Sequence, residues 1–188
     1  MRNLQPVPSP GDDPSSWPRG SGTLREIIMG AQDNLTTVLA VVLGVAIGSG
    51  KLETIALAGM AAGIAEAVSM GGVLYTATRA ERDLAARTSS RSSADRMMRE
   101  PIVAGAVTFA AAVVAAAIPL APFAVLPVRW ATPTAGAVSV AALFALGTWT
   151  GRVTGGVWWR DGIRFVTIGG LAALAAALVG AALRNGAP

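Results

Sequence analysis

The chain has 188 residues, of which 53% are hydrophobic and only 14% charged, and its mean hydropathy is +0.54. A soluble domain carries about 25% charged residues, so this single-domain chain lacks the polar surface that water requires. Cysteine and histidine are both absent, which excludes disulfides, zinc fingers, haem attachment, thiolate nucleophiles and imidazole bases. The net charge is +4, but the basic residues lie between apolar runs and form no single patch, so we expect no nucleic-acid partner.

Residues 1–22 are rich in proline, serine and glycine. This composition predicts a disordered N-terminal tail. The segment has no apolar stretch ending in a small-residue cleavage site, so we do not interpret it as a signal peptide.

Residues 23–188 contain five apolar runs, each close to the roughly 20 residues that a helix needs to span a bilayer. Pro119 and Pro122 are expected to bend or end the third run. The sequence therefore predicts an all-α membrane protein with five transmembrane helices and a linker over 79–100, the spans covering 27–48, 54–78, 102–126, 133–150 and 163–183.

The basic residues are distributed unequally between the two sides of the membrane. One side holds twelve of the 15, including those of the N-terminal tail and the 79–100 linker, while the other holds Lys51, Arg129 and Arg184. Because cytoplasmic loops carry the excess of Lys and Arg, we expect a cytoplasmic N-terminus. The Ala- and Arg-rich composition suggests the plasma membrane of a bacterium.

Small residues recur at four-residue spacing, as in Gly44 with Gly48 and Gly59 with Gly63. In lipid such steps let helix backbones approach closely. They are equally compatible with tight packing inside one chain and with the seam of a homodimer.

Asp33 and Glu66 are the two acidic residues that fall inside the predicted spans. A charge at the centre of a transmembrane helix costs about 2.5–3.5 kcal/mol on insertion scales, and such residues usually pair, relay protons or bind ions. Neither has a basic partner in its own span. The structural alternatives are snorkelling for Asp33, and for Glu66 a protonated carboxyl that bonds to a neighbouring helix.

Helix geometry adds Met70 to these carboxylates. Glu66 and Met70 are four residues apart and share a helix face. At 1.5 Å per residue, Asp33 lies about 9 Å from the cytoplasmic end of its span, Met70 about 12 Å and Glu66 about 18 Å. We therefore expect Asp33 and Met70 at one level. Carboxylates with a thioether suit Fe(II) or Mn(II) better than Mg or Ca, although a methionine in a helix is more often packing than ligand.

Other polar groups are possible accessories of this pathway. Met29 lies one turn before Asp33, while Asn34 and Thr37 follow it and either line a water-filled path or bond to helix carbonyls. Glu81 and Asp83 either collect cations at the cytoplasmic mouth or belong to a solvated helix end beside anionic lipid. No phosphate loop, triad or GxSxG motif is present, so we predict neither an enzyme nor a resident cofactor.

Four stretches in chain order resemble the vacuolar iron transporter family. REIIMGAQDNLTTVLAVVLGVA at 25–46 is similar to its first helix, and AGIAEAVSMGGVLYTATRAERD at 62–83 is similar to its second. AAIPLAPF at 116–123 resembles the proline-bearing third helix, and 142–173 resembles helices four and five with their Gly-Arg and Trp-Trp connection.

The resemblance implies a homodimeric five-helix transporter that exports Fe(II), and often Mn(II), from the cytosol in exchange for protons. It implies a transport aspartate at Asp33, a pore methionine at Met70 and an acidic pathway residue at Glu66. The sequence departs from the family at Asn34, where glycine is usual, and at Ala62, where eukaryotic members carry a glutamate. The glutamate-rich metal-binding domain that many members insert between helices two and three is missing from 79–100.

Two other functions fit the same residues. One hypothesis, based on the missing metal-binding domain, is a membrane anchor that docks a soluble iron-storage or metal-handling partner. The other is a transporter of a small organic cation, in which transport would tolerate the loss of Met70.

Overall fold

The computed structural model describes residues 21–88 and 100–186, and all regular structure in these two stretches is helical. The disordered tail was predicted over 1–22; its first twenty residues lie outside the described residues, as do residues 89–99 of the predicted linker, while the last two residues of the tail, from Ser21, belong to the first helix. Within these two stretches, five helices are long and apolar enough to cross a membrane, so the chain is a multi-pass membrane protein. They are α1 (Ser21–Ser49), α2 (Leu52–Thr88), α4 (Pro101–Val125), α5 (Val128–Thr154) and α6 (Trp158–Gly186).

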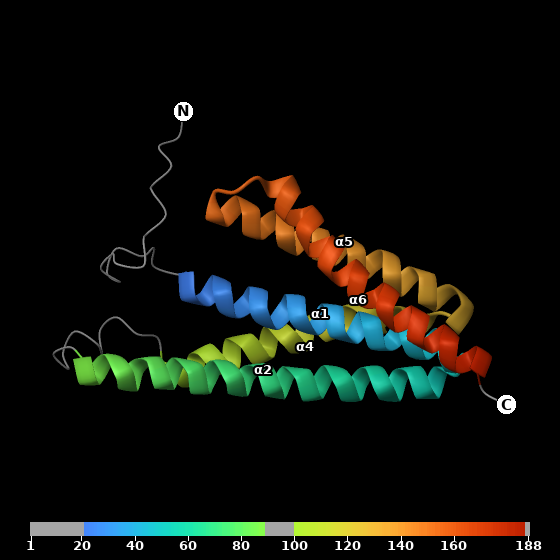
Figure 1. Cartoon of the computed structure of the whole chain (residues 1–188), viewed down its shortest axis with the longest axis horizontal. Helices are drawn as coiled ribbons and strands as arrows, with labels where there is room; N and C mark the ends of the chain where they lie inside the picture. Colours follow the sequence, from blue (N-terminus) through green and yellow to red (C-terminus); the bar gives the residue numbers. More distant parts are fainter. Residues whose placement is uncertain (1–20, 89–99, 187–188) are drawn as a thin grey trace.

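Helix α1 is the centre of the bundle. It contacts α2, α4, α5 and α6, whereas α2 packs mainly on α1 and α4. Figure 1 shows α1 between the α2–α4 pair and the α5–α6 pair. Two buried apolar clusters surround α1, one around Val38 and Val42 and the other around Leu35, Leu143 and Phe165.

Glycines set the turns and the closest helix contacts. Gly50 and Gly155 adopt φ angles of 64° and 75° after α1 and α5, a region that favours residues without a Cβ. A Cβ on Gly44 would lie 2.9 Å from the carbonyl oxygen of Ala176, and one on Gly180 would overlap the carbonyl oxygen of Gly44. These glycines therefore pack helices against each other inside one chain.

The helices extend beyond several of the predicted spans. The second span was predicted over 54–78, and the helix that contains it, α2, continues to Thr88 because a helix does not stop where its residues become charged. The fourth was predicted over 133–150, and the helix that contains it, α5, begins at Val128 with Pro133 inside it. Pro119 and Pro122 likewise lie within α4. Neighbouring helices let transmembrane helices tolerate interior prolines.

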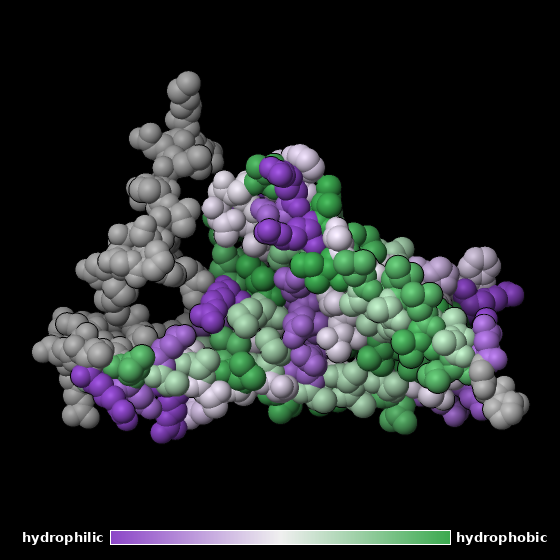
Figure 2. All heavy atoms as spheres, viewed as in Figure 1, coloured by the Kyte–Doolittle hydropathy of each residue, from purple (hydrophilic) through white to green (hydrophobic). Residues whose placement is uncertain are grey.

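Charge is concentrated at the two ends of the bundle. We call the end where α1 begins and α2 ends the arginine-rich end. Among the described residues, it holds seven basic residues: Arg25, Arg79, Arg82, Arg87, Arg152, Arg160 and Arg164. The opposite end holds Lys51, Arg129 and Arg184. Figure 2 shows hydrophilic atoms at both ends and, between them, mainly apolar atoms with a hydrophilic patch over α1 and α2.

Candidate functional site

The two acidic residues predicted inside the membrane lie against each other. The carboxyl groups of Asp33 on α1 and Glu66 on α2 are within hydrogen-bonding reach. Glu66 is half-buried, while Asp33 is exposed on the outside of the single chain. The fold therefore brings together two carboxylates from residues that are far apart in the sequence.

Asn34, the neighbour of Asp33, fixes the position of α1 against α2. Its side-chain amide donates to the carbonyl oxygens of Gly63 on α2 and Ala112 on α4, both at 3.0 Å. Asn34 is fully buried, so these two bonds form where water cannot compete for the amide. Because Gly63 lies about one turn before Glu66, the same bond holds Asp33 beside Glu66.

The absence of a side chain at Gly63 permits this close approach. A Cβ at that position would lie 2.9 Å from the Cβ of Ala116 and 3.2 Å from Cγ2 of Val38. Both distances are shorter than a relaxed carbon–carbon contact, near 3.5–4.0 Å. The glycine therefore lets α2 pack into the groove between α1 and α4.

The contact between Asp33 and Glu66 differs from the depths that the sequence predicted for these residues. Counting residues along the second span from Thr78 placed Asp33 at the same depth as Met70, whereas the structure brings the Asp33 carboxyl to Glu66. The count assumed that the membrane begins at Thr78, while the packing of α2 is set by the Asn34–Gly63 bond. Met70 is half-buried one turn away from Glu66, on the side toward the arginine-rich end.

The accessory residues fall into two groups. Met29 and Thr37 are half-buried and lie one turn on either side of Asp33, hence on its helix face. Asn34 points into the bundle instead, and its amide hydrogens are used by the two backbone carbonyls.

Glu81 and Asp83 are exposed on the extension of α2. Glu81 follows Glu66 by fifteen residues, which is about 22 Å along a helix. The structure therefore does not bring these two carboxylates to Asp33 and Glu66. Asp83 instead acts electrostatically on Arg79.

Asp33 has an unusual position on the most buried helix. Between Glu26 and Gly48 it is the one exposed residue of α1. The described residues contain no group of three or more Asp, Glu, His or Cys side chains placed to hold a metal ion together. A single chain thus offers a carboxylate pair, one member of which opens to the outside of the bundle.

Glu26 is a buried acidic residue that was not among the predicted site residues, because it lies just before the first predicted span. Its exposed fraction is 4%, and it lies two turns before Asp33 on nearly the same face of α1. The seven-residue spacing of Glu26 and Asp33 is the signal that would have found it.

Comparison with known proteins gives a consistent result. The model of the VIT family matches residues 24–98 and 86–181 of this chain. An uncharacterized protein of Methanocaldococcus jannaschii is 29% identical over 146 residues, which cover 71% of this chain and 75% of that protein. The family match includes Asp33, Glu66 and Met70.

Proposed function

This chain belongs to the vacuolar iron transporter (VIT) family, and from that premise we propose that it exports Fe(II) or Mn(II) from the cytosol in exchange for protons. The chain belongs to a family of membrane transporters and has five helices that can span a membrane. It is therefore a transport protein rather than an enzyme. The observation that carries the finer proposal is the contact between the carboxyl groups of Asp33 and Glu66.

The carboxylate pair supplies a physical basis for exchange. Two negative charges at this separation repel each other strongly in a medium of low dielectric constant. A divalent cation between them removes the repulsion, and so does a proton shared by the pair. Cation and proton therefore compete for one site, which is what a coupled antiporter requires.

Met70 supports a transition metal as the cargo. Its thioether lies one helical turn from Glu66, and a soft sulfur ligand favours Fe(II) or Mn(II) over Mg(II), which prefers an all-oxygen octahedron. In this mechanism Asp33 and Glu66 bind the dehydrated ion, and Met70 adds selectivity.

A homodimer follows from the exposure of Asp33. A charge facing lipid near the middle of a helix costs about 2.5–3.5 kcal/mol, and a second copy on this face would cover it. Under two-fold symmetry both chains present the same surface patch to each other, so the Asp33 and Glu66 carboxylates of both chains, four in all, would line the shared path. The transport pathway then lies between the two subunits.

The distribution of arginine supports an orientation. We place the arginine-rich end, with its seven described basic residues, on the cytosolic side by the positive-inside rule. Met70 then lies on the cytosolic side of the carboxylate pair, where an outgoing ion meets it first. The bacterial plasma membrane is the proposed location.

Uptake of Fe(II) and Mn(II) into proteoliposomes under an imposed pH gradient tests the proposal directly. We expect flux that depends on the gradient in the unmodified protein and that is abolished in Asp33→Asn and Glu66→Gln. Glu53→Gln is the matched control, because Glu53 is an exposed carboxylate in the first turn of α2. Met70→Leu should reduce discrimination against Mg(II), while Met60→Leu, at a position 51% exposed, should not.

Normal transport by folded Glu66→Gln would contradict the exchange mechanism. Metal flux that survives in Met70→Leu with unchanged selectivity would contradict the selectivity role of Met70. Absence of metal flux from a folded preparation of the unmodified protein would contradict metal transport and favour either an organic cation as cargo or the role of an anchor for a soluble partner.

A further inference from the structure

Two adjoining cavities lie between α2 and α4. Their volumes are about 310 Å³ and 340 Å³, and they share Tyr75 and Ile102 in their walls. Tyr75 follows Glu66 by nine residues, which is about half a turn around the helix axis at 3.6 residues per turn. The cavities therefore lie on a different side of α2 from the carboxylate pair.

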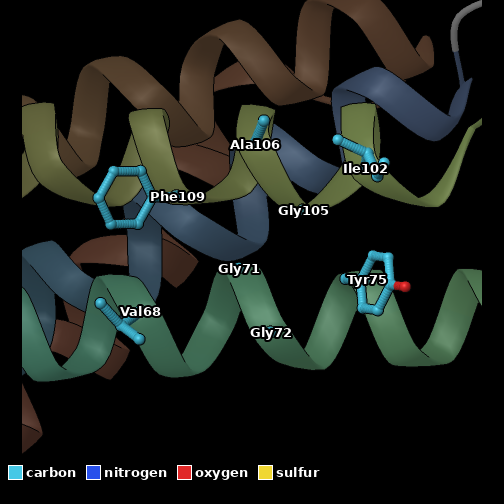
Figure 3. A pocket seen from close by; sticks show the side chains of 8 residues that line it. All are labelled: Val68, Gly71, Gly72, Tyr75, Ile102, Gly105, Ala106 and Phe109. Atoms are coloured by element: carbon cyan, nitrogen blue, oxygen red, sulfur yellow. The ribbon is translucent and has the colours of Figure 1, made fainter.

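The first cavity is an apolar groove that runs along the two helices. Figure 3 shows Val68 and Phe109 at one end, Tyr75 and Ile102 at the other, and glycines between them. A Cβ on Gly105 would lie 2.7 Å from the carbonyl oxygen of Gly71, so the two backbones nearly touch at the floor. A Cβ on Gly72 would meet no atom within 4 Å, which leaves the groove open on the outside.

The second cavity continues the groove with charged walls. It is lined by Tyr75, Arg79, Arg82, Asp83 and Glu100, together with Pro101 and Ile102. Nη1 of Arg79 donates to the hydroxyl of Tyr75 at 3.1 Å, and Asp83 acts on Arg79 electrostatically. The side chain of Glu100 makes no capping hydrogen bond to α4. The cavity thus presents two guanidinium groups and two carboxylates.

The boundary between the two cavities coincides with the point where the sequence of α2 changes from apolar to charged. The sequence of α2 is apolar up to Thr78 and carries its first charge after Glu66 at Arg79. Tyr75 stands at this transition, with its ring in the groove and its hydroxyl toward Arg79. Tyrosine is enriched at membrane interfaces, where one end of the side chain is apolar and the other is solvated.

We propose that this pair of cavities binds one molecule of phosphatidylethanolamine from the surrounding membrane. The apolar groove takes an acyl chain, and Arg79 and Arg82 bind the phosphate, whose oxygens match the planar fork of the guanidinium group. The primary ammonium of the headgroup donates to Asp83 and Glu100.

The charge pattern of the mouth selects this headgroup over two others. Phosphatidylcholine carries a quaternary ammonium without N–H groups, so it offers the carboxylates no hydrogen bond. Phosphatidylglycerol has no cationic group, so it adds a net negative charge to a mouth whose two arginines are already balanced by Asp83 and Glu100. A site that carries both positive and negative charges thus discriminates between headgroups by repulsion as well as by attraction.

Native mass spectrometry of the purified protein, titrated with the three lipids at matched acyl chains, tests the proposal. We expect phosphatidylethanolamine to be retained about tenfold more tightly than the other two, the equivalent of about 1.4 kcal/mol. Gly72→Leu should abolish this preference by filling the groove. Gly136→Leu on α5, where an added Cβ also meets nothing within 4 Å, is the matched control and should keep it.

A second variant tests the headgroup independently of the groove. Asp83→Asn combined with Glu100→Gln removes both carboxylates and should shift the preference to phosphatidylglycerol. Equal retention of all three lipids by the unmodified protein would overturn the proposal, as would stronger retention of phosphatidylglycerol. Retention of phosphatidylethanolamine by folded Gly72→Leu at the level of the unmodified protein would overturn it as well.

Discussion

The side-chain amide of Asn34 lies 3.0 Å from the carbonyl oxygen of Gly63 and joins α1 to α2 beside the carboxylate pair. The same amide also bonds to Ala112 on α4 at 3.0 Å, so one side chain connects three helices. Its Oδ1 has no hydrogen-bond partner among the described residues. Asn34 is therefore a positioning residue that holds Asp33 opposite Glu66.

Replacing this amide should weaken the bundle. Asn34→Ala removes two interhelical hydrogen bonds, each worth about 0.6 kcal/mol on average in a membrane protein. We expect the free energy of unfolding to fall by about 1 kcal/mol or more, measured by denaturation in mixed micelles. Asn185→Ala, at an exposed position near the end of α6, should leave it unchanged. Equal stability of the two variants would contradict the assigned role.

Two glycines on α6 should respond to alanine with opposite signs. Gly180→Ala places a Cβ against the carbonyl oxygen of Gly44 and must separate α6 from α1, at a cost of about 1–3 kcal/mol. Gly170→Ala meets no atom within 4 Å and should stabilise the helix by up to about 1 kcal/mol. Thermal unfolding of both variants measures the difference. The same sign for both would show that the α1–α6 contact is not close-packed.

Single cysteines should report the proposed dimer without interference, because the chain has none of its own. Val73 is 49% exposed and lies two turns after Glu66 on nearly the same face of α2. We expect Val73→Cys to cross-link two chains in native membranes. Leu171→Cys, at a lipid-facing position of α6 that is 64% exposed, should not. A dimer cross-linked only through Leu171→Cys would place the subunit contact on another face.

The sequence was sufficient to predict the five transmembrane helices, because each apolar run matches the thickness of a bilayer. It was not sufficient for their ends, since hydropathy does not decide where a helix stops. The continuation of α2 to Thr88 and the start of α5 at Val128 therefore became visible only in the structure.

The sequence was sufficient to single out candidate site residues but not to predict how they are arranged. Asp33 and Glu66 were identifiable because a carboxylate inside a membrane requires a reason. Their contact depends on how α2 slides along α1, and Gly63 and Asn34 set that register. Since α1 is packed nearly all round, its residue pattern does not reveal which way Asn34 points. The sequence therefore left its role open between pathway and packing.

The exposure of Asp33 links the survival of the protein to its copy number. Under the proposed dimer, an isolated chain presents a carboxylate to lipid, and only association with a second copy covers it. Stability then rises with the concentration of the protein in the membrane, as mass action requires for any folded state completed by a partner. A cell that makes few copies would hold a larger fraction as exposed monomers, which membrane proteases can remove before they are able to carry an ion.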